Sequence, residues 1–328
     1  EPTRPGGDFL FYGAASMTTY QQWIEQHLPD LTGRRVIVTG ANSGLGFEAS
    51  KLLAARGAEV TLAVRNMAKG ANAAQSVRAA VPAARLEVRL LDLTDLASVR
   101  QFASAFCTTH DRLDILLNNA GVMAIPRRET RDGYEMQFGV NHLGHFALTG
   151  LLLPMLLANQ TARIVTVSSG VHVIGNINFA DLNSKRRYNN WLAYAQSKLA
   201  NLLFVYELQR RLENVGSPVL SVAAHPGYAA TNLQSVGPSM AGNRGSQVLM
   251  QAANRVIAQP AVMGALPLVY AAAGAEVRGS DYYGPGSLMG LRGLPVKSRS
   301  SRRSHDRALA TRLWAVSERL TGVTYDLA

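Results

Sequence analysis

The residues of this sequence best suited to chemistry are Tyr194 and Lys198. They are four positions apart in a strongly helical stretch, so their side chains lie on one face of a helix. A phenol ionises at roughly pH 10, too high for a base at neutral pH, and a neighbouring ammonium group stabilises the phenolate. The pair therefore predicts a tyrosine acting as general acid/base, its pKa lowered by the lysine.

A hydroxyl and an amide accompany this pair. Ser169 follows a predicted buried strand, and ligand sites in open parallel sheets lie at the carboxyl ends of the strands. It is the candidate donor to a substrate oxygen, and its neighbour Ser168 is the competing assignment. Asn141 lies in a long helical stretch, where its amide could hold a water that relays protons between Lys198 and solvent. The predicted catalytic residues are Asn141, Ser169, Tyr194 and Lys198.

A glycine-rich turn over residues 39–46 follows a predicted strand and opens a predicted helix. This context is typical of a dinucleotide site, because the turn lacks Cβ atoms and the helix presents free N–H groups to a pyrophosphate. The residues predicted to bind the phosphates are Gly40, Asn42, Ser43, Gly44, Leu45 and Gly46.

Arg65 ends the second predicted strand, 19 residues after Gly46. An acidic residue at this position would bind the ribose 2′-hydroxyl of NAD, whereas a guanidinium suits the 2′-phosphate of NADP. We therefore expect NADP(H) to be preferred over NAD(H). Lys69 either assists Arg65 or belongs to the plain surface.

Further cofactor contacts are predicted after the later strands. Asp92 could accept a hydrogen bond from the adenine amino group, or it could begin the next helix with Thr94. Thr231 could bind the nicotinamide carboxamide. The remaining residues predicted to contact the cofactor are Leu93, Asn119, Ala120, Gly121, Pro226 and Gly227.

Short apolar segments alternate with helical patterns along the chain, which predicts an α/β fold. We expect a single Rossmann-type, doubly wound parallel sheet of about seven strands flanked by helices. The predicted strands cover residues 35–39, 59–64, 86–91, 115–118, 163–167, 219–223 and, as a short seventh, 281–283. The predicted helices cover residues 45–56, 67–80, 96–108, 131–158, 191–212 and 305–320.

The predicted organisation is an N-terminal extension over residues 1–30, a catalytic domain over 31–290, and a basic loop with a C-terminal helix over 291–328. Met17 is a candidate for the natural start, which would make residues 1–16 a non-native extension. Two long connections, 170–190 and 231–246, interrupt the alternation, and the second has the Gly- and Ser-rich composition of a lid. Val171, His172, Tyr228 and Leu233 are predicted to line an apolar substrate pocket.

Composition excludes several classes of protein. The net charge is +11, but much of the basic excess lies in residues 292–312 without interleaved aromatic residues, so we expect a solvated basic loop and no nucleic-acid partner. The apolar run 151–157 is too short to span a membrane. We therefore expect a cytoplasmic protein without stable membrane insertion.

The sulfur and imidazole groups suggest no metal site. Cys107 is the single cysteine, which cannot form an internal disulfide and is expected to be buried. His142 and His145 are three positions apart without a nearby acidic or cysteine partner, so no metal is predicted and both are expected to pack.

Together these motifs resemble the short-chain dehydrogenase/reductase family, and they occur in the family's order between about residues 32 and 284. The resemblance implies Tyr194 as the acid/base, Lys198 as its partner and holder of the nicotinamide ribose, Ser169 as the substrate-oxygen donor and Asn141 as the water holder. These residues would move a hydride between nicotinamide and a carbonyl or alcohol.

Three features resemble the retinol-dehydrogenase and protochlorophyllide-reductase-like branch. They are the spacing of 25 residues between Ser169 and Tyr194 and the sequence segments 141–146 and 194–201. Bacterial members of this branch are often soluble. The expected substrate is a lipophilic carbonyl or alcohol, and homo-oligomers form in some relatives through the two long helices. The alternative function is a non-catalytic NADP-sensing or scaffold protein of the same fold.

Overall fold

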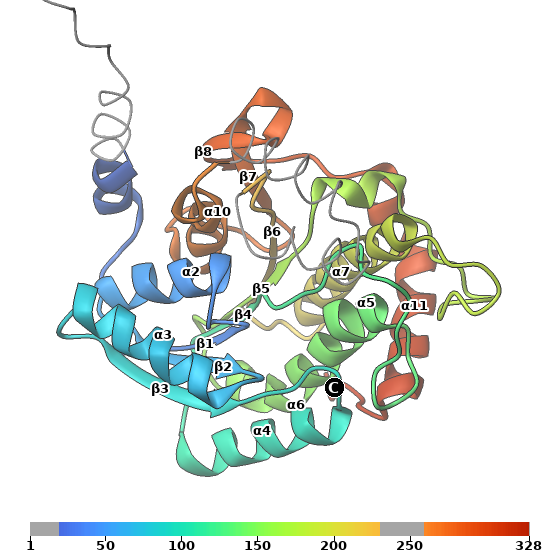
Figure 1. The fold of residues 1–328 in the computed structure, drawn as a ribbon, viewed down its shortest axis with the longest axis horizontal. Coiled ribbons are helices and arrows are strands. Elements are labelled where there is room, and N and C mark those ends of the chain that lie inside the picture. The colour runs from blue at the N-terminus through green and yellow to red at the C-terminus, as the bar shows by residue number, and fades with distance from the viewer. Residues whose placement is uncertain (1–19, 230–258, 328) are drawn as a thin grey trace, which may run out of the picture.

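The computed structural model describes residues 20–229 and 259–327, and its centre is an eight-stranded sheet (Figure 1). The strand order is β3-β2-β1-β4-β5-β6-β7-β8. Strands β1 to β7 run parallel, and β8 pairs antiparallel with β7. The strands are β1 (Arg35–Thr39), β2 (Glu59–Val64), β3 (Arg85–Leu90), β4 (Ile115–Asn118), β5 (Arg163–Val167), β6 (Leu220–Ala224), β7 (Tyr282–Ser287) and β8 (Arg292–Lys297).

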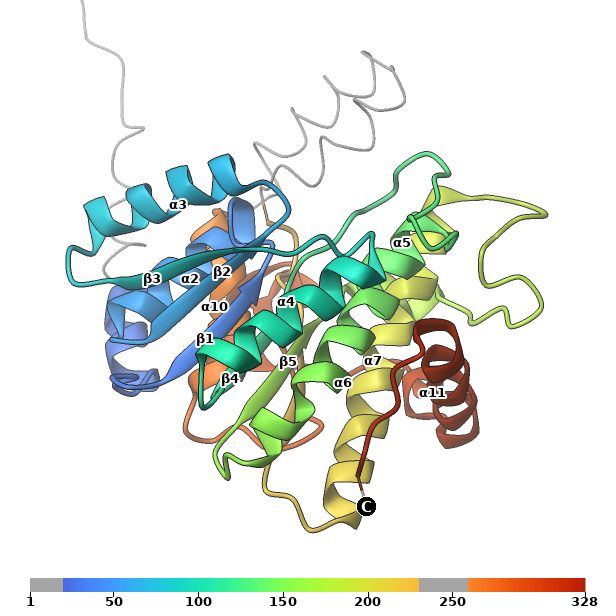
Figure 2. The ribbon, with the colours of Figure 1, turned by 90° about the horizontal axis from the view of Figure 1, so that it is seen from below.

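Helices cover both faces of the sheet, and α11 lies outside α7 (Figures 1 and 2). On one face α2, α3 and α10 bury side chains such as Leu52, Ala73 and Leu266 against the strands. On the other face α4, α6 and α7 do so with Phe102, Phe146 and Phe204. The helices are α2 (Gly44–Ala55), α3 (Met67–Ala80), α4 (Leu96–Thr109), α5 (Met136–Phe138), α6 (Gly144–Leu157), α7 (Asn190–Asn214), α10 (Ala261–Ala273) and α11 (Arg307–Thr321).

The chain order reverses between β1 and β4, where β1 pairs with β2 on one side and β4 on the other. Loops on the two sides of this switch point diverge and leave a crevice at the carboxyl ends of the strands. The doubly wound sheet predicted from the sequence is confirmed, with eight strands instead of about seven.

The additional strand lies in the segment predicted to be a basic loop. Residues 292–297 form β8, and Arg302–His305 form a short 3-10 helix before α11. The hairpin pairing with β7 was not visible in the sequence, because glycine and proline in both strands resemble turn composition.

The helix predicted over residues 131–158 begins later. Glu135 is the N-cap, and its carboxylate accepts hydrogen bonds from the backbone N–H groups of Gln137 and Phe138. A π-helical turn over Gly139–Leu143 then joins α5 to α6. The continuous helix Met136–Leu157 is long and apolar enough for a membrane span, but 72% of its most apolar window is buried inside the protein.

Cys107 is exposed, which contradicts the predicted burial. The buried face of α4 is formed by Val99, Phe102, Ala103 and Phe106, and the next residue points away from it. The predictions for residues 1–16, Thr231, Leu233 and the 231–246 connection lie outside the described residues.

Candidate active site

The glycine-rich turn after β1 is a tight backbone cradle. Gly40 and Gly44 have φ angles of 68° and 56°, in the left-handed region that favours glycine. A Cβ on Gly46 would lie 2.5 Å from both the Gly40 carbonyl oxygen and Asn119 Nδ2. Helix α2 starts here with no acidic residue in its first turn, and its N-cap Ser43 makes no side-chain capping bond. The cradle therefore leaves helix N–H groups and a hydroxyl available to an anion.

Thr39 fastens this cradle to the loop after β4. Its hydroxyl oxygen lies 2.9 Å from the backbone nitrogens of Asn119 and Ala120, which donate to it, and 2.9 Å from His145 Nε2. The other ring nitrogen, His145 Nδ1, lies 3.1 Å from the Asn141 carbonyl oxygen, which can only accept. His145 Nε2 therefore accepts the threonine proton. Sequence reasoning missed this role of Thr39, although its position before Gly40 was a signal.

A cleft of about 470 Å³ opens beside the cradle. All the predicted cofactor residues that precede Tyr194 line it. Its lining residues are Gly40, Asn42, Ser43, Gly44, Leu45, Gly46, Ala63, Arg65, Lys69, Leu91, Asp92, Leu93, Thr94, Asn119, Ala120, Gly121, Val122, Ile125, Arg128, Met136 and Val140.

Three exposed cations lie along the cleft: Arg65, Lys69 and Arg128. Arg128 was not predicted, because it lies in an irregular loop whose path the sequence does not reveal. Asp92 lines the cleft while its Oδ1 accepts hydrogen bonds from the backbone and hydroxyl of Thr94, and the next helix begins after its N-cap Asp95.

Ser169 and Tyr194 come together at the carboxyl end of β5. Burial raises the pKa of Tyr194 to about 12, against the lowering effect of a hydrogen bond with the Ser169 side chain. Burial also lowers the pKa of Lys198 to about 8. The lowering of the tyrosine pKa expected from Lys198 is therefore not found, because burial dominates, and at neutral pH the phenol keeps its proton.

The lysine ammonium has a defined place beside the tyrosine. Lys198 Nζ lies 5.7 Å from the centre of the Tyr194 ring and donates to the Val167 carbonyl oxygen at 2.9 Å. Ser168 Oγ donates to the Lys198 carbonyl oxygen at 2.8 Å, inside the protein. Of the two competing serines, Ser168 is thus engaged in holding α7, and Ser169 is the one beside Tyr194.

Asn141 braces the loop that follows β4. Its Oδ1 accepts from the Val122 N–H at 2.8 Å, and its Nδ2 donates to the Val122 carbonyl oxygen and Ser197 Oγ, each at 2.9 Å. The second lone pair of Oδ1 can still accept a hydrogen bond from a water. A Cβ on Gly121 would lie 3.1 Å from Asn141 Oδ1 and 3.7 Å from Lys198 Nζ. Gly121 is therefore where the cleft meets the catalytic residues.

The turn after β6 also takes its shape from a distant segment. Gly227 has a φ of 64°, and a Cβ there would lie 2.4 Å from the Leu291 carbonyl oxygen. The Pro226 carbonyl oxygen accepts from Gln259 Nε2 at 2.8 Å. These residues lie at the carboxyl edge, outside the lining of the cleft. His172 is 2% exposed and hydrogen-bonded at both ring nitrogens, so it does not line an open pocket as predicted.

The paired histidines are packed, as expected. His142 bonds Ser317 Oγ at 2.9 Å, and burial lowers the pKa values of His142 and His145 to about 3 and about 4. Both rings are therefore neutral at neutral pH and pack inside the protein. Within the described residues no group of three or more His, Cys, Asp or Glu side chains has the arrangement of a metal site.

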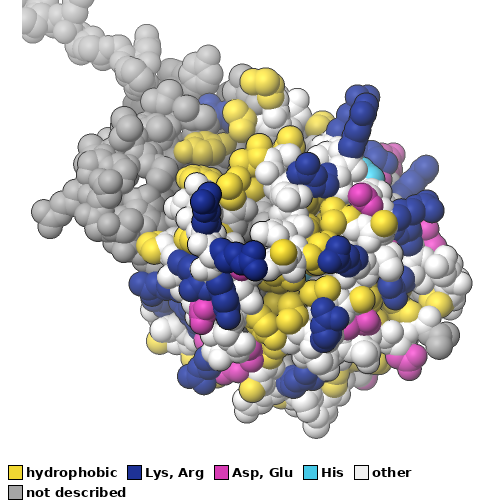
Figure 3. All heavy atoms as spheres, turned by 90° about the vertical axis from the view of Figure 1, so that its right-hand side faces the viewer, with side chains coloured by type: hydrophobic (Ala, Val, Ile, Leu, Met, Phe, Trp, Pro, Cys, Tyr) yellow, Lys and Arg dark blue, Asp and Glu magenta, His cyan; other side chains and the backbone are white. Residues whose placement is uncertain are grey.

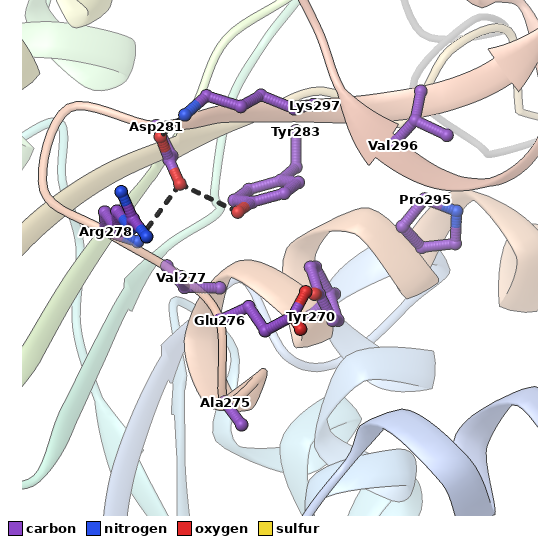
Figure 4. A pocket seen from close by; sticks show the side chains of 10 residues that line it. All are labelled: Tyr270, Ala275, Glu276, Val277, Arg278, Asp281, Tyr283, Pro295, Val296 and Lys297. Carbon is purple, nitrogen blue, oxygen red and sulfur yellow. Dashed lines mark hydrogen bonds and ion pairs between the residues drawn. The ribbon is translucent and has the colours of Figure 1, made fainter.

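A second cleft, of about 660 Å³, lies between the end of α10 and the β7–β8 edge (Figure 4). Its buried carboxylate, Asp281, accepts from the Tyr283 hydroxyl at 2.8 Å and from the Arg278 backbone at 3.0 Å, and it pairs with Lys297. The carboxylate is satisfied by the protein itself, and no residue predicted for the site lies here.

The basic residues do not gather into one continuous patch on the face beside α11. Figure 3 shows Lys and Arg side chains spread over this face among hydrophobic, uncharged and acidic groups. Arg312, for example, lies over the ring of Phe179 at 4.0 Å, and Arg211 over Trp314 at 4.3 Å. Part of the basic excess is thus used in packing.

Residues 34–240 match the family model of the short chain dehydrogenases. The chain belongs to the short-chain dehydrogenase family. Human retinol dehydrogenase 13 is 42% identical over 294 residues, covering 89% of this chain and 86% of the relative. Human retinol dehydrogenase 12 is 48% identical over 203 residues, covering 62% of this chain and 64% of that protein. The chain therefore lies in the retinol-dehydrogenase-like branch of the family.

A crystal structure of an uncharacterised protein from Mycobacterium paratuberculosis is similar to this short-chain dehydrogenase throughout. It is 46% identical, has a TM-score of 0.75, and covers 91% of this chain and 97% of its own. Family and branch make the chain an oxidoreductase of alcohols and carbonyls that uses a nicotinamide cofactor. The residues present fit that cofactor, because the positions where a Cβ would fill the cradle are glycines and the cleft is lined by cations.

Proposed function

We propose that this short-chain dehydrogenase is an NADP(H)-preferring oxidoreductase that interconverts a lipophilic carbonyl compound and its alcohol, with Tyr194 as the general acid/base. The observation that carries the proposal is the meeting of Ser169, Tyr194 and Lys198 beside Gly121, at the end of a cleft lined by the glycine cradle. The bound nicotinamide supplies or accepts the hydride.

The preference for NADP(H) rests on charge. Arg65, Lys69 and Arg128 line the cleft, and Arg65 follows β2, where a carboxylate would favour the ribose hydroxyls of NAD. A 2′-phosphate carries a negative charge that these cations neutralise, and a guanidinium binds it through a fork of donors. The Gly40–Gly46 turn, Asn119, Ala120 and Gly121 hold the rest of the cofactor.

The proton chemistry follows from the pKa values. Tyr194 is protonated at neutral pH, so it can donate to a carbonyl oxygen held by Ser169 as negative charge develops there. Lys198, with a pKa of about 8, stabilises the phenolate that this transfer leaves. Asn141 keeps Val122 and Ser197 in place and offers its remaining lone pair to a relay water. In the oxidation of an alcohol Tyr194 takes the proton back.

The lipophilic substrate is supported by side chains that flank the catalytic residues. Val173 and Ile174, shortly after Ser169, are 61% and 60% exposed. Trp191 and Leu192, shortly before Tyr194, are 43% and 55% exposed. Large apolar side chains exposed together are typical of binding surfaces for apolar ligands. The relatives named above are retinol dehydrogenases, which agrees with such a substrate.

The test is a steady-state assay with a panel of apolar aldehydes and ketones, in which NADPH and NADH are compared at equal concentration. We expect turnover with NADPH and a lower kcat/KM with NADH. A cofactor titration by nucleotide fluorescence runs in parallel. Tight NADPH binding without turnover on any panel member would favour a cofactor-sensing protein, and equal use of both cofactors would contradict the role of Arg65.

A further inference from the structure

The segment that follows Ser169 is held by the C-terminal part of the chain. Residues Gly170–Ile174 form a 3-10 helix with Ser169 as its N-cap. Within it, His172 Nδ1 lies 2.7 Å from the Ser169 carbonyl oxygen, and Nε2 lies 3.0 Å from the backbone nitrogen of Ser301. The carbonyl can only accept and the amide can only donate. The ring is therefore neutral, with its proton on Nδ1.

A second contact joins the same two segments. The Arg303 guanidinium donates to the carbonyl oxygen of Gly175, directly after the 3-10 helix. The segment Ser300–His305, here called the clamp, is thus hydrogen-bonded at two points to the 3-10 helix after Ser169 and its C-cap.

The clamp is itself fixed to α7, the helix that carries Tyr194. Ser300 Oγ lies 2.8 Å from both the Tyr206 hydroxyl and His305 Nε2. The His305 ring stacks on Tyr206 with 4.5 Å between ring centres. Tyr206 lies on the same helix as Tyr194 and is also buried. The clamp therefore links the segment after Ser169 to α7, the helix that carries Tyr194.

We propose that His172 is a positioning residue through which the Ser301 backbone sets Ser169 against Tyr194. The proposal rests on the proposed function, in which the Ser169 hydroxyl holds the substrate oxygen. Ser169 Oγ already accepts from the Val171 N–H at 3.3 Å, so the orientation of this turn also decides where the hydroxyl points. An imidazole fixed at both nitrogens restrains the turn more tightly than solvent-exposed backbone would.

Protonation of His172 would place an N–H against the Ser301 N–H and release the clamp. Burial is the largest influence on His172 and lowers its pKa, which keeps the ring neutral. Repulsion from His305 also lowers this pKa, whereas the hydrogen bond to the Ser169 backbone raises it. The other titratable groups around the ring are Tyr282, whose ring centre is 5.8 Å away, and His225, whose pKa His172 helps to lower. Arg303 is the nearby cation of the clamp.

The test exploits the backbone of Ser301, whose φ is −66° and ψ is 152°. Proline adopts this φ, so Ser301→Pro removes the N–H donor while it preserves the backbone path. Ser301→Ala keeps the N–H, and the buried Ser301 hydroxyl has no hydrogen-bond partner to lose. The two variants therefore differ mainly in the one bond to His172.

We expect Ser301→Pro to lower kcat about fivefold to tenfold, the effect of one hydrogen bond, with an unchanged KM for NADPH. Ser301→Ala should retain the wild-type kcat. His172→Asn keeps an amide donor for the Ser169 carbonyl oxygen but offers no equivalent acceptor, so it should match Ser301→Pro. Combining the two should add no further loss. Wild-type kcat in Ser301→Pro, or an equal loss in Ser301→Ala, would overturn the proposal.

An NMR titration of the His172 ring nitrogens separates this proposal from the proposed function. In wild type and Ser301→Ala we expect the neutral Nδ1–H tautomer and a low pKa, and in Ser301→Pro a raised pKa, because the donor to Nε2 is lost. Identical titrations in the two variants overturn the proposal whatever the activity. A wild type without turnover on any carbonyl, but with the expected difference between variants, would contradict the proposed function and leave the clamp established.

Discussion

The two halves of the carboxyl edge are held together in different ways. The cofactor half, after β1 to β4, is joined by contacts within the N-terminal part of the chain, such as the bonds of Thr39 to Asn119 and His145. The catalytic half, after β5 to β7, depends on segments far along the chain. His172 bonds Ser301, and Gly227 packs under Leu291. These contacts of the first half lie within residues 39–145, whereas those of the second require the C-terminal residues to be in place.

This difference predicts that substitutions in the two halves will have separable kinetic effects. A cofactor that is bound before chemistry and a proton donor used only during chemistry affect different rate constants. Changes in the cofactor half should appear in cofactor affinity, and changes in the catalytic half in kcat.

The largest effect is expected for Tyr194→Phe, which removes the proton donor without changing the ring. Loss of a general acid lowers kcat by about 10²–10⁴-fold, while the dissociation constant of NADPH should stay at its wild-type value. The measurement is single-turnover NADPH oxidation together with a binding titration. Tyr134→Phe is the matched control, because its hydroxyl bonds the Leu320 carbonyl oxygen away from the catalytic residues. Substantial turnover by Tyr194→Phe would refute the assignment.

Gly46→Ala should produce the converse pattern. Its Cβ would lie 2.5 Å from the Gly40 carbonyl oxygen, so the cradle must open. Overpacking of about 1–3 kcal/mol corresponds to a cofactor affinity lowered by about 5-fold to 150-fold, with kcat at saturating NADPH largely retained. Gly170→Ala, in the catalytic half, is the control, since its Cβ would meet nothing within 4 Å. Calorimetric titration with NADPH measures the cofactor affinity of both variants. Unchanged affinity in Gly46→Ala would contradict a preformed cradle.

Arg65→Gln tests the cofactor half with less disruption, because the side chain is exposed. Loss of one charge-assisted bond should raise the KM for NADPH about tenfold and leave the KM for NADH almost unchanged. Lys69→Gln, its neighbour along the cleft, should have a smaller effect. If Lys69→Gln or Arg128→Gln proves the more damaging change, the 2′-phosphate lies nearer that cation than the sequence suggested.

The sequence revealed the cofactor half more fully than the catalytic half. The glycines after β1 and the residues after β4 could be assigned to the cofactor site from their type and position, because a cofactor cleft needs backbone without Cβ atoms. The order of Ser169, Tyr194 and Lys198 was equally visible. Each of these signals lies within a few residues of a strand end or on one helix face.

What the sequence could not show depends on contacts between distant segments. His172 was interpreted as lining a pocket, but its place is decided by Ser301, 129 positions away. The pKa of Tyr194 was expected to fall, yet burial, which no spacing reveals, raises it to about 12. The strand β8 was interpreted as a loop because its pairing with β7 is a tertiary feature. In each case packing overrode a local pattern.

The last prediction concerns stability and whether the two halves respond alike to acid. Burial lowers the pKa of His145, in the cofactor half, and of His225, in the catalytic half, to about 4 in each case, from an ordinary value of 6.5. Between these pH values the unfolded chain binds more protons than the folded one. Stability is therefore complete above about pH 6.5 and declines as the pH falls towards 4, by up to about 1.4 kcal/mol per pH unit for each ring.

Urea unfolding across this pH range measures the slope for wild type, His145→Gln and His225→Gln. Each substitution should reduce the slope by the same amount, because each removes one ring with the same shifted pKa, even though their stabilities at neutral pH will differ. A reduction confined to His225→Gln would mean that His145 takes up its proton in the folded protein at an ordinary pKa, in spite of its bonds to Thr39 and Asn141. The cofactor half would then be the less acid-sensitive of the two, and the difference between the halves would extend from the source of their contacts to their stability.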